Sequence, residues 1–339
     1  MSSWSPLRFE PLLRRYLWGG RRLESLLGKR LPPGDDYAES WELVDHGADQ
    51  SVVRAGPHAG MTLAQLLRDH PADLLGVDAA ACRPAAAKQV DEPTRARFPL
   101  LFKFLDAHQS LSVQVHPTDA AAALQSPPDL GKTEAWVIVH ADPGAVLYAG
   151  LKRGFDRPAL EREVNRGTTH LCLQKFEPRA GDCFFIPAGT VHALGAGLVV
   201  AEIQQSSDST FRLYDWNRVG KDGQPRPLHI AQSLDSIDFH REPVVAQIPR
   251  PTERPGAERL VECDKFVLER WHTADACELE TVGKFHVVMM LDGAVRVADD
   301  PVERPLVRGE TCLIPAACGR ATLDPLGGRP AQWLVARLP

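Results

Sequence analysis

The middle of the chain and its tail carry the same short pattern, and this internal repeat constrains the fold more than any other feature. Gly181–Ala188 (GDCFFIPA) aligns with Gly309–Ala316 (GETCLIPA), and upstream the alignment loosely places Glu134 over His286. Each copy has the pattern of a strand, a Gly-Asp or Gly-Glu turn, an apolar strand and a proline turn. A small antiparallel jelly roll needs this order, because it protects its edges by doubling the sheet. The repeat therefore predicts two jelly-roll barrels.

The rest of the chain is mainly β in pattern, with a small helical insertion in its N-terminal half. Leucines at helical spacing follow Thr62, a plausible N-cap, in a segment at about 60–97 that ends in an Ala- and charge-rich loop. Residues 243–259 (PVVAQIPRPTERPGAER) are rich in proline and charge, which is typical of a linker. We therefore expect an N-terminal domain at 1–242 and a C-terminal domain at 260–339.

Composition excludes several classes of protein. The 339 residues include 44% hydrophobic and 24% charged side chains, as in a globular protein with a real core. The chain has 39 Lys and Arg residues against 44 Asp and Glu residues, and it contains no dense basic run. We therefore expect neither nucleic acid nor a membrane surface as a partner. The seven scattered cysteines contain no C-x-x-C, so neither a disulfide framework nor a zinc ribbon is indicated. With no signal peptide or membrane span in the pattern, we expect a cytoplasmic protein.

Polar and apolar residues alternate just before Pro117. In an extended chain this places Ser112, Gln114 and His116 on one face, and Leu111, Val113 and Val115 on the other. The next expected strand offers Lys132 and Glu134 at the same period. A Gln-x-His pair alone is most often part of a solvated edge. Two strands that each present metal-ligand side chains on one face suggest instead a metal site inside a barrel.

Three further segments carry chemically noticeable residues. Lys103 interrupts the apolar run Phe98–Leu105, which has the pattern of a strand buried on both sides. His192 follows a turn and begins a return strand, where a histidine is more often a satisfied core residue. Asp208, Thr210, Arg212 and Tyr214 share one face of the segment 206–216 if it is extended. The alternative for Lys103 is a side chain whose ammonium group reaches solvent, and the alternative for Arg212 is an ordinary surface charge.

Four segments in this order resemble the type I mannose-6-phosphate isomerases, or phosphomannose isomerases, which have a cupin fold. They are FPLLFKFLDAHQSLSVQVHP (98–117), GKTEAWVIV (131–139), PAGTVHALG (187–195) and AEIQQSSDSTFRLYDW (201–216). YAESWEL (37–43) and LVECDKFVLERW (260–271) are similar to the shorter bacterial members. The resemblance covers nearly the whole chain, so it implies two cupin barrels, the first of them catalytic.

The resemblance also implies the site residues. One divalent metal, usually zinc, would be bound by Gln114, His116, Glu134 and His192. The family's active-site arginine corresponds to Arg212. Its other pocket residues correspond to Lys103, Ser112, Lys132, Glu202 and Asp208. Leu194 stands where many longer members carry tyrosine, so the open end of the substrate site differs here.

The implied reaction moves a proton between C1 and C2 of a sugar phosphate through an enediol. A divalent cation and the guanidinium of Arg212 can each stabilise the negative charge that develops on the oxygens. Nitrogen and oxygen ligands favour zinc but would accept cobalt, iron or manganese. Lys103, Ser112 and Arg212 could donate to the phosphate. The proton carrier is either Lys132, near a cation that would favour its neutral amine, or Glu202 on the adjoining strand.

Two other function classes are compatible with a cupin fold. A non-catalytic cupin could bind a sugar or sugar phosphate, but it would not need the complete ligand set together with Arg212. A metal-dependent oxygenase typically has more histidine ligands and no phosphate-binding residues. In the second copy of the repeat the Gln-x-His strand is missing and Arg320 replaces His192. We therefore expect the C-terminal barrel to bind no metal.

Overall fold

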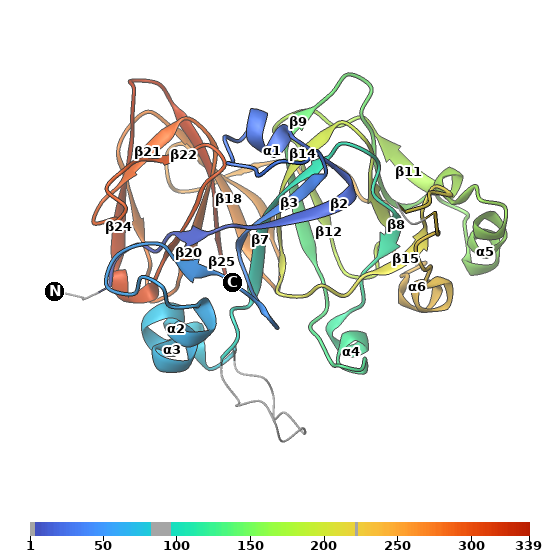
Figure 1. Ribbon diagram of the computed structural model, residues 1–339, viewed down its shortest axis with the longest axis horizontal. Helices are drawn as coiled ribbons and strands as arrows, with labels where there is room; N and C mark the ends of the chain where they lie inside the picture. Colours follow the sequence, from blue (N-terminus) through green and yellow to red (C-terminus); the bar gives the residue numbers. More distant parts are fainter. Residues whose placement is uncertain (1–3, 83–95, 221–222) are drawn as a thin grey trace.

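The computed structural model describes residues 4–82, 96–220 and 223–339, and the chain is mainly β (Figure 1). Its strands form two lobes side by side, and each lobe contains one six-stranded sheet and one smaller sheet. Most of the Ala- and charge-rich loop expected at the end of the helical insertion lies outside the described residues.

The N-terminal lobe has sheets of six and five strands, in the orders β12-β9-β14-β7-β3-β2 and β11-β10-β13-β8-β15. The first contains β12 (Cys183–Ile186), β9 (Glu134–Ala141), β14 (Leu198–Gln205), β7 (Leu100–Ala107), β3 (Tyr37–Leu43) and β2 (Leu12–Gly20). The second contains β11 (Leu173–Phe176), β10 (Leu147–Leu151), β13 (His192–Leu194), β8 (Val113–Val115) and β15 (Phe211–Tyr214). Two small sheets pair β1 (Phe9–Glu10) with β6 (Val52–Val53) and β4 (Asp45–His46) with β5 (Asp49–Gln50).

The C-terminal lobe has sheets of six and four strands, in the orders β16-β17-β18-β25-β20-β23 and β19-β24-β21-β22. The first contains β16 (Arg250–Pro251), β17 (Ala257–Glu262), β18 (Val267–Thr273), β25 (Ala331–Arg337), β20 (His286–Asp292) and β23 (Thr311–Ile314). The second contains β19 (Cys277–Glu280), β24 (Arg320–Pro325), β21 (Ala294–Val297) and β22 (Leu306–Val307).

The two six-stranded sheets repeat the same order of strands. Read from β12 in one lobe and from β23 in the other, successive strands along each sheet correspond one to one. Glu134 pairs with Ile186 between β9 and β12, and His286 pairs with Ile314 between β20 and β23. This register agrees with the alignment of GDCFFIPA with GETCLIPA, so the sequence repeat is also a repeat of structure.

Helices are short and lie around the sheets. They are α1 (Arg22–Ser25), α2 (Leu63–Asp69), α3 (Pro71–Leu75), α4 (Asp119–Ala122), α5 (Arg157–Asn165) and α6 (Ile230–Ser236), with 3-10 turns η1 (Val77–Ala79), η2 (Thr169–Cys172) and η3 (Ala316–Cys318). Thr62 caps α2 as expected: its hydroxyl accepts from the backbone N–H of Gln65, whose side chain accepts from the N–H of Thr62. None of the described helices is long and apolar enough to span a membrane.

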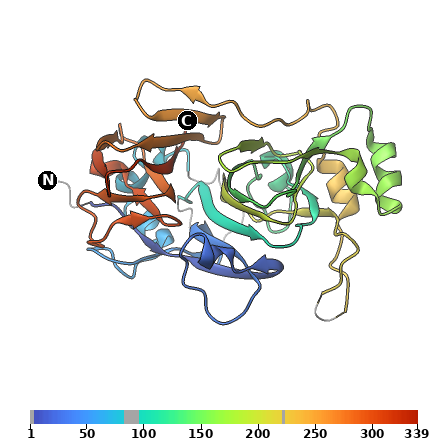
Figure 2. The same cartoon turned by 90° about the horizontal axis from the view of Figure 1, so that it is seen from above.

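The segment 243–259, expected to be a linker, contributes strand β16 and the beginning of β17 to the C-terminal sheet. Seen from above, the orange segment that leads into the C-terminal lobe runs along one side of both lobes (Figure 2). The division into domains at 242 and 260 stays a prediction.

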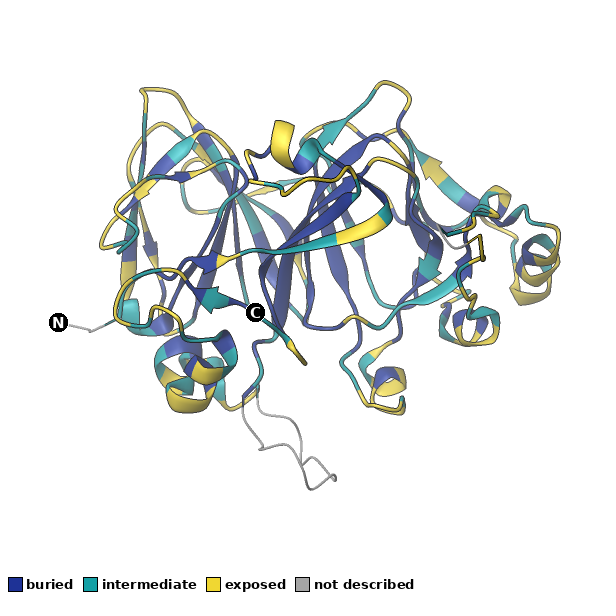
Figure 3. Ribbon diagram, viewed as in Figure 1, coloured by how far each residue is buried: buried dark blue, intermediate teal, exposed yellow. Residues whose placement is uncertain are grey.

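One hydrophobic core joins the lobes. On β14, Val199, Ala201 and Ile203 pack in the same cluster as Met289 and Leu334 of the C-terminal lobe. The expected strand buried on both sides is observed as β7, and both β7 and β14 are buried along their whole length (Figure 3). A continuous apolar pattern is typical of such two-sided burial. One face of these strands therefore packs on the second lobe, and the other faces the interior of the first.

Replacing Phe285 by alanine tests the shared core. Phe285 is fully buried, and its ring centroid lies 4.8 Å from that of Phe98 in the N-terminal lobe. We expect Phe285→Ala to lower the free energy of unfolding by about 3–5 kcal/mol, because it leaves a cavity at the junction. Urea unfolding measures this change. Ile248→Ala, at a side chain that is 86% exposed, should change stability by less than about 0.5 kcal/mol. Equal effects of the two substitutions would contradict the role of this core.

Candidate metal centre and active-site cavity

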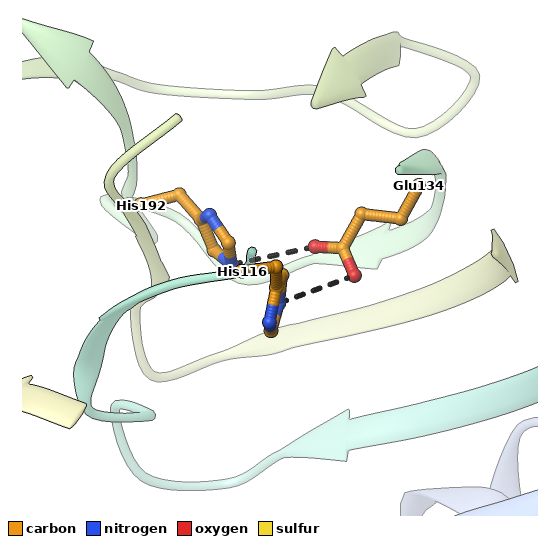
Figure 4. Close-up of side chains that lie close together, drawn as sticks. All are labelled: His116, Glu134 and His192. Atoms are coloured by element: carbon orange, nitrogen blue, oxygen red, sulfur yellow. Dashed lines mark ion pairs between the residues drawn. The ribbon is translucent and has the colours of Figure 1, made fainter. Parts of the chain in front are cut away.

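Three strands of the N-terminal lobe bring two histidines and a glutamate together. His116 follows β8, His192 begins β13 and Glu134 begins β9. Figure 4 shows both rings beside the carboxylate, with His192 Nε2 3.3 Å from Glu134 Oε1 and His116 Nε2 3.5 Å from Glu134 Oε2. The ligand atoms of His116, Glu134 and His192 all lie within 4.8 Å of one another, which is close enough to hold a metal ion. No other group of His, Cys, Asp and Glu side chains among the described residues meets this condition.

The other nitrogen of each ring is held by the backbone. His116 Nδ1 lies 2.9 Å from the carbonyl of Ser209, and His192 Nδ1 lies 2.8 Å from the carbonyl of Thr190. Each Nδ1–H therefore donates to a carbonyl, which leaves the Nε2 lone pairs directed at the glutamate, the arrangement that metal-binding histidines adopt. Burial lowers the pKa of His192 to about 4. Burial, and next the positive charge of Lys132, lower the pKa of His116 well below its usual value. Both rings are therefore neutral at neutral pH, as metal ligands must be.

Gln114 reaches the same group. Its register partner on β13 is His192, and its amide nitrogen lies 3.4 Å from His192 Nε2. Its amide oxygen accepts from the hydroxyl of Ser112 at 3.2 Å. A half-turn of the amide about its last bond would present the oxygen, which is the atom that coordinates a cation.

Carboxylates and lysines alternate across the floor of the site. Lys103 lies 3.6 Å from Glu39 and 3.3 Å from Glu202, and Lys132 lies 3.6 Å from Glu202 and 2.8 Å from Glu134. Strand register explains this order, because Glu202 of β14 pairs directly with Lys103 of β7. All five side chains are buried.

These contacts set the protonation of the two neighbouring carboxyls. Burial raises the pKa of Glu134 to about 8, and the negative charge of Glu202 adds to this effect. Burial also opposes the charge on Glu202, but Lys103 and Lys132 outweigh it, so the pKa of Glu202 lies below its usual value. A cation beside Glu134 would take the place of that proton. The donor set therefore fits a divalent metal.

A cavity of about 310 Å³ opens above this floor. The sequence indicated ten site residues, and nine of them line the wall of this cavity: Lys103, Ser112, Gln114, Lys132, Glu134, His192, Glu202, Asp208 and Arg212. The tenth, His116, belongs to the metal-ligand group. Leu194, the departure from the family pattern, also lines the cavity. The structure thus brings the predicted residues together, while their individual roles stay predictions.

Sequence reasoning missed several residues of the cavity wall. They include Tyr16, Trp18, Glu39, Trp136 and Arg226. Glu39 could have been found, because a charged residue within the buried strand β3 is as noticeable as Lys103 in β7. Arg226 lies in an irregular segment that has no periodicity, so no pattern indicated it.

Arg212 is the guanidinium at this site that has no carboxylate partner among the described residues. Its Nη1 donates to the carbonyl of Pro227 at 2.9 Å, while the neighbouring Arg226 forms two hydrogen bonds with Asp215, of 2.8 and 2.6 Å. Burial and then the positive charge of Arg226 lower the pKa of Arg212. Arg212 therefore presents an unneutralised positive charge to the cavity.

Two expected side-chain directions are wrong. Tyr214 was expected on the same face as Arg212, but a register shift in the pairing of β15 with β8 follows Arg212, and Tyr214 packs in the opposite core. Leu111 was expected to point with Val113 away from the site. It lines the cavity instead, because the regular strand begins only at Val113.

Asp129 holds the segment that positions Asp208 and the carbonyl partner of His116. Its Oδ2 accepts from the hydroxyl of Ser207 at 3.0 Å, from that of Ser209 at 3.3 Å and from the backbone N–H of Asp208 at 3.3 Å. Asp129 lies outside the cavity wall and was also missed, since its role depends on contacts about 80 residues away along the chain.

Comparison with known proteins gives consistent relatives. Residues 7–135 match the profile of the phosphomannose isomerase type I catalytic domain. Mannose-6-phosphate isomerase ManA of Bacillus subtilis is 32% identical to this chain, and the alignment covers 94% of this chain and 96% of ManA. The mannose-6-phosphate isomerase of Streptococcus mutans is 33% identical, with 91% and 92% covered.

Solved structures have the same fold. The crystal structure of the mannose 6-phosphate isomerase from Bacillus subtilis superimposes with a TM-score of 0.84 at 27% identity, covering 98% of this chain and 99% of that one. A phosphomannose isomerase from Salmonella typhimurium, at 16% identity, shares the fold with a TM-score of 0.74 over 98% of this chain and 100% of that one.

Removing His116 tests the metal centre. We expect His116→Ala to abolish stoichiometric binding of a divalent metal, because it removes a ligand whose orientation is fixed by the carbonyl of Ser209. Metal analysis of the purified protein measures this. The control is His140→Ala, which changes a half-buried histidine on the same strand as Glu134 that lies away from the metal-ligand group and contacts Asp142. A full equivalent of metal in His116→Ala would refute the assignment.

Proposed function

The chain belongs to the type I phosphomannose isomerase family, and on this premise we propose that it is a metal-dependent aldose–ketose isomerase that interconverts mannose 6-phosphate and fructose 6-phosphate. One observation carries the proposal: a buried group of two neutral histidines and a glutamate opens on a cavity that also contains an unneutralised arginine. We further propose that each pair of sheets is a cupin jelly-roll barrel and that the second barrel binds no metal. All seven cysteines are free, and a reducing cytoplasm is the proposed location.

Gln114, His116, Glu134 and His192 would hold one divalent ion, for which Zn²⁺ fits the nitrogen and oxygen donors best. Two neutral imidazoles, one amide and one carboxylate leave the centre with a net positive charge. When bound, such a cation stabilises negative charge on the sugar oxygens O1 and O2.

Arg212 would stabilise the same developing charge from the other side. Its guanidinium lines the cavity and has no carboxylate partner among the described residues, so its field is available to a bound oxyanion. Lys103, Ser112 and Asp208 would bind the substrate from the cavity wall. Lys103 is held as a cation, because Glu202 and Glu39 outweigh the effect of burial and raise its pKa.

The proton is removed from C1 or C2 and returned to the other carbon. Lys132 and Glu202 both line the cavity and lie 3.6 Å apart. Lys132 also contacts Glu134 and His116, so it would act beside the metal centre. Glu202 lies between two lysines that favour its ionised form. The two residues stay alternatives as the proton carrier.

A coupled isomerase assay beside metal analysis tests the proposed function. We expect turnover of mannose 6-phosphate to fructose 6-phosphate that a chelator abolishes and Zn²⁺ restores, because the cation supplies charge stabilisation that no side chain replaces. Binding of the sugar phosphate without turnover, at full metal content, would favour a non-catalytic binding protein and refute the isomerase.

Replacing Arg212 separates charge stabilisation from metal binding. We expect Arg212→Ala to lower kcat by about 10²- to 10³-fold with the metal still bound, as is typical when one stabilising donor is removed. Arg212→Lys should recover part of this loss, since it restores the charge but not the planar geometry. Arg166→Ala, at an exposed arginine after α5, is the control. Full activity in Arg212→Ala would contradict the proposed role.

A further inference from the structure

A second cavity, of about 480 Å³, opens in the C-terminal lobe at the place that corresponds to the active-site cavity. His286 lines this cavity and pairs with Ile314, just as Glu134 lines the first cavity and pairs with Ile186. The two cavities therefore open at equivalent points of two sheets with the same strand order.

The residues at equivalent positions have different chemistry. Val287, which follows His286, pairs with Ala336, as Ala135, which follows Glu134, pairs with Ile203. Arg337 and Gln204 are the next residues on the partner strands. Two residues earlier on the same strands, Val335 takes the place of Glu202, and its partner Glu269 takes the place of Lys103. The alternating carboxylates and lysines of the first lobe are thus absent at these positions of the second.

Arginines dominate the wall of the second cavity. Four line it: Arg250, Arg254, Arg259 and Arg337. Arg259 is neutralised, because it donates to Glu262 at 2.8 Å and to Glu269 at 3.1 Å. The other three form no ion pair with a carboxylate in the described parts of the chain, and Glu253 is the remaining carboxylate of the wall. The wall therefore has an excess of positive charge.

Two of these arginines are held in place by neutral contacts. Arg337 Nη1 donates to the carbonyl of Leu338 at 2.9 Å, and the Arg254 guanidinium lies 5.5 Å from the ring centroid of Trp271. Neither contact offsets the charge. Unpaired guanidinium groups that share a cavity repel one another, and a bound anion removes that repulsion.

His286 adds an unsatisfied polar atom. Its side chain is only 6% exposed, and its Nδ1 has no hydrogen-bond partner among the described residues. Leaving a buried polar group unpaired costs about 1–3 kcal/mol, so such a group usually has a ligand or water as its partner. Burial and next the charge of Arg337 lower the pKa of His286 to about 4, against a smaller opposing effect of the Lys284 backbone, whose contact with the ring falls short of hydrogen-bond geometry. The neutral ring keeps one N–H that can donate to a ligand.

We propose that this cavity of the C-terminal lobe binds a small phosphate ester, with Arg254 and Arg337 contacting the phosphate and His286 donating a hydrogen bond. A phosphate ester carries about −1.5 to −2 charges at neutral pH, which matches the excess of guanidinium groups better than a single carboxylate does. Guanidinium also fits phosphate through paired hydrogen bonds. The cavity is larger than the first, so it has room for a sugar-sized group. This inference does not depend on the isomerase activity.

Calorimetric titration of the full chain with inorganic phosphate tests the proposal. We expect one binding event that persists in Arg212→Ala, where the first cavity has lost its free guanidinium, and that weakens at least about tenfold in Arg337→Ala. Arg337→Lys, which keeps the charge at this position, should weaken binding less and guards against loss of folding. Arg296→Ala, at an exposed arginine of the same lobe, is the matched control.

Three outcomes would overturn the proposal. They are no binding of phosphate by the unmodified chain, equal binding by Arg337→Ala and Arg296→Ala in folded protein, and loss of all binding in Arg212→Ala. The last result would place the anion in the first cavity.

Discussion

Burial of β7 and β14 on both faces is the constraint on which the site depends. One face of these strands packs against the C-terminal lobe, so the charged residues on the other face have no solvent to compensate them. A buried charge without a partner is strongly destabilising. Lys103 and Glu202 therefore occur directly opposite each other, and Lys132 continues the alternation towards Glu134. The second lobe thus positions the site through packing, without placing a side chain in the cavity.

The same burial prepares the ligands. Removal of water lowers the pKa of both histidines, and backbone carbonyls fix which ring nitrogen carries the proton. The carbonyl that holds His116 belongs to Ser209, whose segment is tied down by Asp129. Asp129 itself is held by His46, which contacts the same Oδ2, and by Arg97, which contacts Oδ1. A network around Asp129 that lies outside the cavity wall therefore determines the orientation of one metal ligand.

The sequence indicated most of the site because a strand has a period of two. Alternation placed Ser112 and Gln114 on one face. Lys103 interrupts an apolar strand pattern, and this indicated a charged side chain in the floor of the site. The internal repeat predicted corresponding barrels and correctly aligned Glu134 with His286, but it could not show that the lobes share a core, since the facing apolar residues look like any buried strand. Arg226 reaches the cavity from an irregular segment, and such placements depend on tertiary contacts that periodicity does not contain.

The repeat separates fold from chemistry. In the first cavity Glu39, Glu134 and Glu202 face two lysines, so these five groups have a formal excess of one negative charge and attract a cation. In the second, four arginines face three glutamates, so the charged groups of the wall have a formal excess of one positive charge. Both walls stand on sheets with the same strand order. The two lobes thus share one order of strands, while the side chains at equivalent positions of the cavities differ in charge, as where His286 takes the place of Glu134.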